Sequence, residues 1–332
     1  MPRVSPGSVL FTTYNMLDLF QSGGVAGRRH YQRVTDVIRG IGADVVAVQE
    51  IRGASASQAR ARLRRLARDV GMCCVVPAQG GEAGLHGESG QRGESGETAL
   101  AVGSRGYHCG LMWRPGLEVV PGSFRESGAG RLWHSAGWAT FRLDGRLVRH
   151  AVFHATPFGR QLRARQNELL ASMLSAGPDG GVPLLIGADW NAQSADRVPD
   201  PRTWQPRLYE PSDPFAAVSW DEDLVHQCCY QDSADGIRRH WVDLSAGEAL
   251  VAGGLLDAAA ALRAPWQATC GYFPGDGYGS RGILRRIDGI RVTAPVLPAL
   301  RAHLVTDTPA ARLASDHLPV TVEYVPAGIA GS

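Results

Sequence analysis

The stretch Val182-Pro183-Leu184-Leu185-Ile186-Gly187-Ala188-Asp189-Trp190-Asn191 passes from an apolar run directly into a polar cluster. A short apolar run that ends in polar residues is typical of a buried strand with chemistry at its end. Ser315-Asp316-His317 stands beside another such run, from Pro319 to Tyr324. The two clusters predict a sheet edge that carries a functional site.

Three further polar residues each close a strand-like run: Asn15, Glu50 and His154. Carboxylate and amide oxygens suit a hard divalent cation, and histidine can donate a hydrogen bond to an anionic oxygen. If these strand ends meet at one edge, the combined set predicts a metal-dependent phosphoesterase site.

Six motifs together resemble the endonuclease/exonuclease/phosphatase superfamily of DNase-like phosphoesterases. Any one of them is weak alone, but all six follow the family's order along the chain. The motifs are Thr13-Tyr14-Asn15-Met16, Gln49-Glu50, His154 followed by Arg165-Gln166, Gly187-Ala188-Asp189-Trp190-Asn191, Arg286-Ile287-Asp288 and Ser315-Asp316-His317-Leu318-Pro319-Val320.

The periodicity predicts an α/β fold, with helices over residues 28–39, 160–175 and 255–262 between apolar strand-like runs. Two halves of mixed strands and helices indicate a four-layer α/β/β/α sandwich with two packed mixed β-sheets, which the resemblance also implies. Since the motifs span residues 15 to 317, we expect one catalytic domain over residues 1–332.

The resemblance implies that Glu50 binds the metal, with Asn15 and Asp316 beside it. We expect Mg²⁺, with Mn²⁺ as a possible substitute, because Mg²⁺ needs few carboxylates besides water and substrate oxygens. Asp189 is expected to accept the proton of an attacking water, while Asn191 orients the substrate or Asp189 itself.

His317 is expected to donate a hydrogen bond to the phosphoryl group in the transition state. Asp288 would hold its imidazole and raise its pKa. His154 is the second candidate donor, although a histidine at a strand end can also be satisfied by backbone alone. Trp190 points to the other face of its strand and is predicted to pack in the core.

Composition excludes some alternatives. The net charge is +2 and every basic residue is Arg, so no global basic bias marks a dedicated nucleic-acid binder. No long apolar segment predicts membrane insertion, and the expected location is the cytoplasm. The sequence leaves the oligomeric state open.

The six cysteines are not expected to form disulfides. His226, Cys228, Cys229 and His240 fit no standard zinc spacing, so thiols without a metal are the preferred interpretation.

Several segments bear on the substrate. Residues 79–97 are predicted to form a flexible loop, and residues 192–249 form an insertion with little periodicity. Its tryptophans, Trp204 and Trp241 with Trp220, could stack on a base or cover another planar or apolar group. Arg286 is expected to contact phosphate within the cluster Arg281, Arg285 and Arg286, whereas Arg60, Arg64 and Arg68 are expected to form a solvated helix face.

The sequence thus predicts a Mg²⁺-dependent phosphodiester hydrolase, preferably a nuclease, that uses in-line attack of water. A phosphomonoesterase or phosphodiesterase acting on a small metabolite or lipid head group is the first alternative, and an inert binding module is the second. The tyrosine motif of abasic-site enzymes and the Trp-Cys-Asp-Arg motif of inositol phosphatases have no counterpart here.

Overall fold

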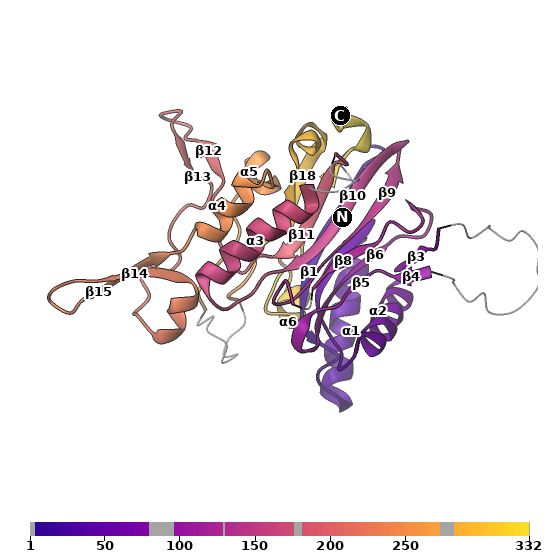
Figure 1. The fold of residues 1–332 in the computed structure, drawn as a ribbon, viewed down its shortest axis with the longest axis horizontal. Helices are drawn as coiled ribbons and strands as arrows, with labels where there is room; N and C mark the ends of the chain where they lie inside the picture. The colour runs from indigo at the N-terminus through magenta and orange to yellow at the C-terminus, as the bar shows by residue number, and fades with distance from the viewer. Residues whose placement is uncertain (1–3, 80–95, 129, 176–180, 273–281, 332) are drawn as a thin grey trace, which may run out of the picture.

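The computed structural model describes residues 4–79, 96–128, 130–175, 181–272 and 282–331. Two large sheets pack face to face, and helices cover their outer faces (Figure 1). This is the expected α/β fold with two packed mixed sheets. Residues 80–95 of the predicted flexible loop lie outside the described residues.

The first sheet has the strand order β18-β19-β1-β2-β6-β5, with β1 and β2 parallel. Its strands are β1 (Val9–Leu19), β2 (Val45–Arg52), β5 (Leu100–Ala101), β6 (Tyr107–Trp113), β18 (Leu300–Val305) and β19 (Val320–Tyr324).

The second sheet has the order β16-β17-β11-β10-β9-β7, with β8 also paired to β9 and with β10 and β11 parallel. Its strands are β7 (Glu118–Val119), β8 (Arg125–Ser127), β9 (Ala136–Leu143), β10 (Arg146–His154), β11 (Leu184–Asp189), β16 (Leu256–Asp257) and β17 (Asp288–Val292).

Three small hairpins lie outside these sheets: β3 (Val75–Pro77) with β4 (Gly96–Thr98), β12 (Arg197–Pro199) with β13 (Pro206–Leu208), and β14 (Cys228–Asp232) with β15 (Arg238–Val242). The helices are α1 (Gly24–Ile41), α2 (Ala56–Val70), α3 (Arg160–Ser175), α4 (Ser245–Ala252), α5 (Ala258–Ala261) and α6 (Pro309–Ala314), with 3-10 turns η1 (Ser104–Gly106), η2 (Glu222–His226), η3 (Ala294–Ala299) and η4 (Pro326–Gly328).

Three apolar clusters fill the interfaces between the four layers. One lies between the sheets and includes Phe11 and Leu185, and a second joins the first sheet to α1 and α2. The third joins the second sheet to α3 and α4 through Ile186 and Leu170. Because both faces of β11 are covered, its side chains are all buried, which explains its unbroken apolar sequence.

The insertion is more ordered than its sequence predicted. Residues 197–242 contain the hairpins β12–β13 and β14–β15, and α4 follows directly. Phe215, Leu224 and Cys228 form a small apolar core of their own. Short strands rich in charge and proline lack the long alternation by which strands are recognised, so local sequence did not reveal them.

Other elements differ from expectation at their ends. The helix expected over residues 255–262 is only the short α5 after β16, and the strand that carries Asp288 begins at this residue. Ser55 caps α2 as expected, accepting a hydrogen bond from the backbone N–H of Gln58. No described helix is both long and apolar enough to cross a lipid bilayer.

The sheets approach closely at Gly187, where a Cβ atom would lie 2.7 Å from the Cβ of Thr13 and 3.2 Å from that of Ala47. We therefore expect Gly187→Ala to lower the free energy of unfolding by about 1–3 kcal/mol through overpacking. Urea denaturation measures the change. Gly181→Ala is the control because a Cβ there meets no atom within 4 Å. Equal stability of the two variants would contradict the close contact.

Candidate active site

The second sheet aligns three predicted site residues across adjacent strands. His154 on β10 is paired with Asp189 on β11, and Asp189 is paired with Asp288 on β17. Directly opposed residues point to the same face of a sheet, so the three side chains form a row. Strand register therefore brings together residues that are 134 positions apart along the chain.

The first sheet supplies Asn15 from β1 and Glu50 from β2. The Asn15 side-chain amide donates to Glu50 Oε1 at 3.0 Å and to Asp189 Oδ2 at 2.9 Å, so it bridges the two sheets. Glu50 has a positive φ of 64°, and its Oε2 accepts a hydrogen bond from the backbone N–H of Asp18 at 2.7 Å. The unusual backbone conformation at Glu50 interrupts the regular strand and turns the Glu50 carboxylate toward Asn15.

His317 is held by a buried carboxylate. Its Nδ1 lies 2.8 Å from Asp288 Oδ2, and the Thr269 hydroxyl donates to the same oxygen at 2.7 Å. Burial lowers the pKa of His317, but Asp288, Asp316 and Asp189 together raise it well above its usual value. Burial raises the pKa of Asp288 to about 6. The pair therefore retains a proton, as the predicted orienting role of Asp288 requires.

His154 contacts the same central carboxylate, with Nε2 3.3 Å from Asp189 Oδ2. Burial lowers the pKa of His154, but its hydrogen bond to Asp189 and the charge of Asp189 outweigh this effect and the pKa is raised. His154 therefore contacts a carboxylate through Nε2, and its Nδ1 is buried without a hydrogen-bond partner. Its role as a donor to the substrate stays a prediction.

A further histidine, His134, was missed by sequence analysis. Its ring stacks on that of His154, with the centroids 4.0 Å apart and the planes at 12°. Burial, and then the charge of His154, lower the pKa of His134 to about 2, so it is neutral. His134 lies in the connection before β9 and has no motif around it. Only its place in the fold reveals it.

Asp189 is the centre of the arrangement. Burial raises its pKa, but His317 and His154 lower it further, so the group is ionised at neutral pH. The Asn191 N–H donates to Asp189 Oδ1 at 2.9 Å, and the Asn191 side chain donates to the carbonyl of Ala155. Asn191 therefore fixes Asp189 through its backbone, while its amide is held by the end of the neighbouring strand.

The donor set fits a hard divalent cation. The carboxylates of Glu50, Asp189, Asp288 and Asp316 lie at the site together with the imidazoles of His154 and His317. Among the described residues, ligand atoms of Asp189, Asp288 and His317 lie within 4.8 Å of one another. The excess of carboxylates is an electrostatic reason for metal binding, and Glu50, Asn15 and Asp316 can offer it oxygen atoms.

The sequence model of the Endonuclease/Exonuclease/phosphatase family matches residues 12–317. The chain belongs to this family. Its members are phosphoric ester hydrolases, which assigns the chain to that class of enzyme. A comparison with curated proteins gives no match.

Solved structures of the endonuclease/exonuclease/phosphatase family share the fold. A family protein from Bacteroides vulgatus is 15% identical over 95% of this chain and 98% of its own, with a TM-score of 0.57. An AP endonuclease from Archaeoglobus fulgidus is 16% identical over 95% and 99%, with a TM-score of 0.52. The Bacteroides thetaiotaomicron mannosyl-6-phosphatase is 15% identical over 95% and 98%, with a TM-score of 0.50.

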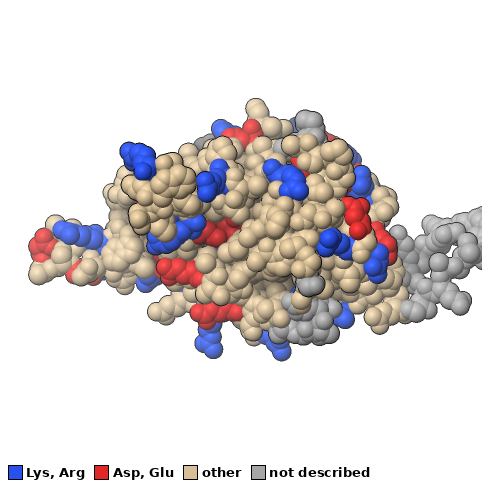
Figure 2. Space-filling model, turned by 90° about the horizontal axis from the view of Figure 1, so that it is seen from above, with Lys and Arg blue, Asp and Glu red and all other residues tan. Residues whose placement is uncertain are grey.

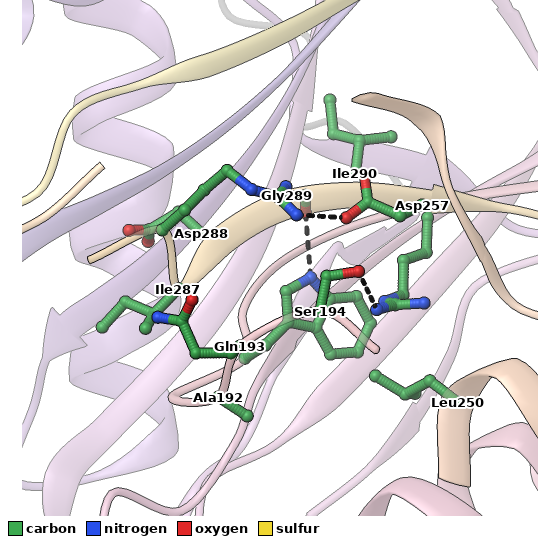
Figure 3. Close-up of a pocket in the computed structure, with 12 residues that line it drawn as sticks. Ala192, Gln193, Ser194, Leu250, Asp257, Ile287, Asp288, Gly289 and Ile290 are labelled. Atoms are coloured by element: carbon green, nitrogen blue, oxygen red, sulfur yellow. Dashed lines mark hydrogen bonds and ion pairs between the residues drawn. The ribbon is translucent and has the colours of Figure 1, made fainter. Parts of the chain in front are cut away.

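Arg286, expected to contact substrate phosphate, lies instead in a buried ion-pair cluster. Its guanidinium is 2.6 Å from Glu210 Oε1 and 2.6 Å from Asp257 Oδ2, and the residue is 4% exposed. Figure 3 shows Asp288 pointing away from this cluster, which borders a cavity of about 10 Å³ beside Trp190. The Arg286 guanidinium is already paired with two carboxylates, so the structure contradicts the expected contact between Arg286 and a substrate phosphate. Trp190 is buried, as predicted.

The insertion tryptophans occupy different places. Trp204 is 72% exposed near the tip of β12–β13 and Trp241 is 46% exposed on β15. The two hairpins project from the body in different directions (Figure 1). Trp220 packs against Tyr230 and His240. A groove of about 340 Å³ separates the hairpins, lined in part by Arg207, Leu208, Val242 and Leu244.

All six cysteines are free, as the sequence indicated. The alternative zinc set around Cys228 and Cys229 is not among the metal-binding groups found in the described residues. Cys229 instead contacts Arg160 and Asp243, and Cys228 is buried in the core of the insertion.

The charge state of His317 gives a test of this geometry. Asp288→Asn removes the first of the carboxylates that raise the His317 pKa, so this pKa should fall as burial is opposed by fewer charges. An NMR titration of the imidazole in metal-free protein measures it. Asp200→Asn, which changes a half-buried carboxylate in the β12–β13 hairpin, is the control and should leave the His317 pKa unchanged. A variant that keeps the wild-type value would exclude Asp288 as the controlling group.

Proposed function

We propose that this chain is a Mg²⁺-dependent phosphodiester hydrolase that acts as a nuclease. The observation that carries the proposal is the convergence of Asn15, His154 and the Asn191 N–H on the ionised carboxylate of Asp189. This geometry supports Asp189 as the group that orients an attacking water and accepts its proton. Asn15 and Asn191 would fix its two oxygens.

The two charged histidines supply the electrostatic part of the mechanism. His317 and His154 both have raised pKa values, so each can donate a hydrogen bond to a phosphoryl oxygen as negative charge develops there. Asp288 keeps the His317 ring in one orientation through Nδ1 and leaves Nε2 directed toward Asp189, 3.8 Å away. His134 would limit rotation of the His154 ring by stacking.

Glu50, Asn15 and Asp316 would hold the metal, with Mg²⁺ preferred and Mn²⁺ as a substitute. A bound divalent cation neutralises phosphoryl charge and lowers the pKa of bound water. Glu50 is already oriented by the Asp18 N–H and by Asn15, which leaves its carboxylate with little freedom to lose on binding.

A second candidate function has specific support. The groove between the hairpins and the near-neutral charge favour a small phosphoester, such as a phosphorylated metabolite or a lipid head group, over a long duplex. Figure 2 shows basic and acidic side chains interspersed on the face in view. The arrangement of Asn15, Glu50 and His154 around Asp189 argues against an inert binding module.

A substrate panel tests the function. The purified protein with Mg²⁺ or Mn²⁺ is assayed on duplex DNA, single-stranded DNA, RNA, bis(p-nitrophenyl) phosphate and several phosphomonoesters. A nuclease should cleave one or more nucleic acids faster than any monoester. Preference for a monoester would favour the second candidate function, and a chain inactive on all of these would contradict the nuclease proposal.

Glu50→Gln tests the metal assignment within the same assay. Loss of a charged oxygen ligand should reduce activity and Mg²⁺ affinity by about 100-fold or more, because even groups that only support a ligand contribute 10–100-fold. Isothermal titration calorimetry measures the affinity. Glu118→Gln on β7 is the matched control. Wild-type Mg²⁺ affinity in Glu50→Gln would exclude Glu50 as a ligand.

Trp241 tests the role of the insertion in substrate choice. It is exposed and adjoins Val242 of the groove, so Trp241→Ala should raise KM for single-stranded DNA about tenfold through lost stacking. Trp204→Ala tests the other hairpin, and Leu147→Ala on β10 is the control. Point variants are preferable to deleting residues 197–246, because that deletion would also remove Glu210 from Arg286. Unchanged KM in both tryptophan variants would reject stacking.

A further inference from the structure

Arg285, the neighbour of the ion-paired Arg286, has a different environment. It is 8% exposed, yet no carboxylate of the described residues lies within 4.0 Å of its guanidinium. Its Nε is buried without a hydrogen-bond partner, and its Nη2 is 3.6 Å from the sulfur of Cys270, a weak acceptor. A buried guanidinium without a counter-charge is costly, since its hydration is lost and not replaced.

The nearby carboxylates of the insertion have other partners. Asp213 accepts hydrogen bonds from the N–H groups of Phe215 and Val242, and Asp243 accepts from Cys229 and Ser245. Burial lowers the pKa of the neighbouring Arg163 to about 10, while Asp243 and Asp189 raise it and Arg160 and Arg285 lower it further. Arg285 therefore shares this side of the site with two other arginines as well as with these carboxylates.

Backbone pairing connects Arg285 directly to the catalytic residues. Cys270 forms antiparallel bridges with Arg285 on one side and with His317 on the other. Opposed residues share a face, so the Arg285 and His317 side chains lie on the same face with Cys270 between them. Two strand spacings separate them by about 10 Å. At this spacing the long Arg285 side chain can contact an anionic group next to the one that His317 contacts.

The ring of Phe215, from the core of the insertion, lies 6.0 Å from the Arg285 guanidinium carbon. The insertion thus packs against this side chain beside the active site and excludes water from it. A cation that has no counter-ion among the described residues can pair with charge brought by a ligand.

The geometry points to Arg285 as the binding residue for a second anionic group of the substrate, a phosphate next to the one that is hydrolysed. The inference rests on the proposed function and names a substrate class, phosphodiesters that carry a further phosphate. The guanidinium would form a charge-assisted contact that can be bidentate.

The kinetic test uses two chromogenic diesters that differ by one phosphate: the p-nitrophenyl ester of thymidine 5′-phosphate, with and without a 3′-phosphate. Wild type should favour the ester with two phosphates, and Arg285→Met should reduce that preference in kcat/KM by about 10-fold or more, mainly through KM. Arg285→Lys should restore part of it. Arg146→Met, which removes a charge at the other end of β10, should leave the preference unchanged.

A stability measurement separates binding from a structural role. Arg285→Met should raise Tm by about 2 °C or more without ligand, because it removes an uncompensated buried charge. Arg286→Met should lower Tm, because it leaves Glu210 and Asp257 unpaired. A lower Tm for Arg285→Met, or an unchanged preference between the two esters, overturns the inference. If wild type hydrolyses neither ester, the diesterase proposal fails, and the Tm comparison still decides whether Arg285 lacks a structural partner.

Discussion

The hydrogen bonds of the Asn15 amide are the interaction on which the site depends. This one group donates to Glu50 from its own sheet and to Asp189 from the opposite sheet. The expected metal ligand and the expected base are therefore placed relative to each other by the packing of the sheets. Each sheet brings a parallel strand pair, β1–β2 or β10–β11, whose ends meet at this edge. The absence of a side chain at Gly187 allows the approach.

The charge states of the site residues around Asp189 depend on one another. The carboxylate stays ionised because two histidines next to it are held charged, and these are charged because several carboxylates surround them. The protonation state of each of these groups is therefore coupled to that of the others. His134 is the exception, since burial keeps it neutral and leaves it only a stacking contact with His154.

The sequence predicted His154 and Asp189 at the ends of their strands because each apolar run stops at a polar residue. It placed the ends of β1 and β2 too early, since these strands continue past Asn15 and Glu50 to Leu19 and Arg52. It could not distinguish Arg285 from Arg286. Neighbouring residues on an extended chain face opposite sides, and which side meets the site depends on pairing with distant strands. His134 was missed for a related reason, since its partner His154 lies on another element. The insertion hairpins escaped detection because their strands are too short to show a period.

The ion pairs of Arg286 with Glu210 and Asp257 have a consequence for how the molecule opens. Glu210 belongs to the insertion, whereas Arg286 lies two residues before Asp288, the residue proposed to orient His317, and both are buried. Moving this part of the insertion away would expose the pair to water and leave unmatched charges in the interior. Local opening of this segment and loosening of the catalytic strand are therefore coupled events. The Glu210 segment is therefore expected to unfold together with the strand that carries Asp288, while the exposed hairpin tips can move independently of it.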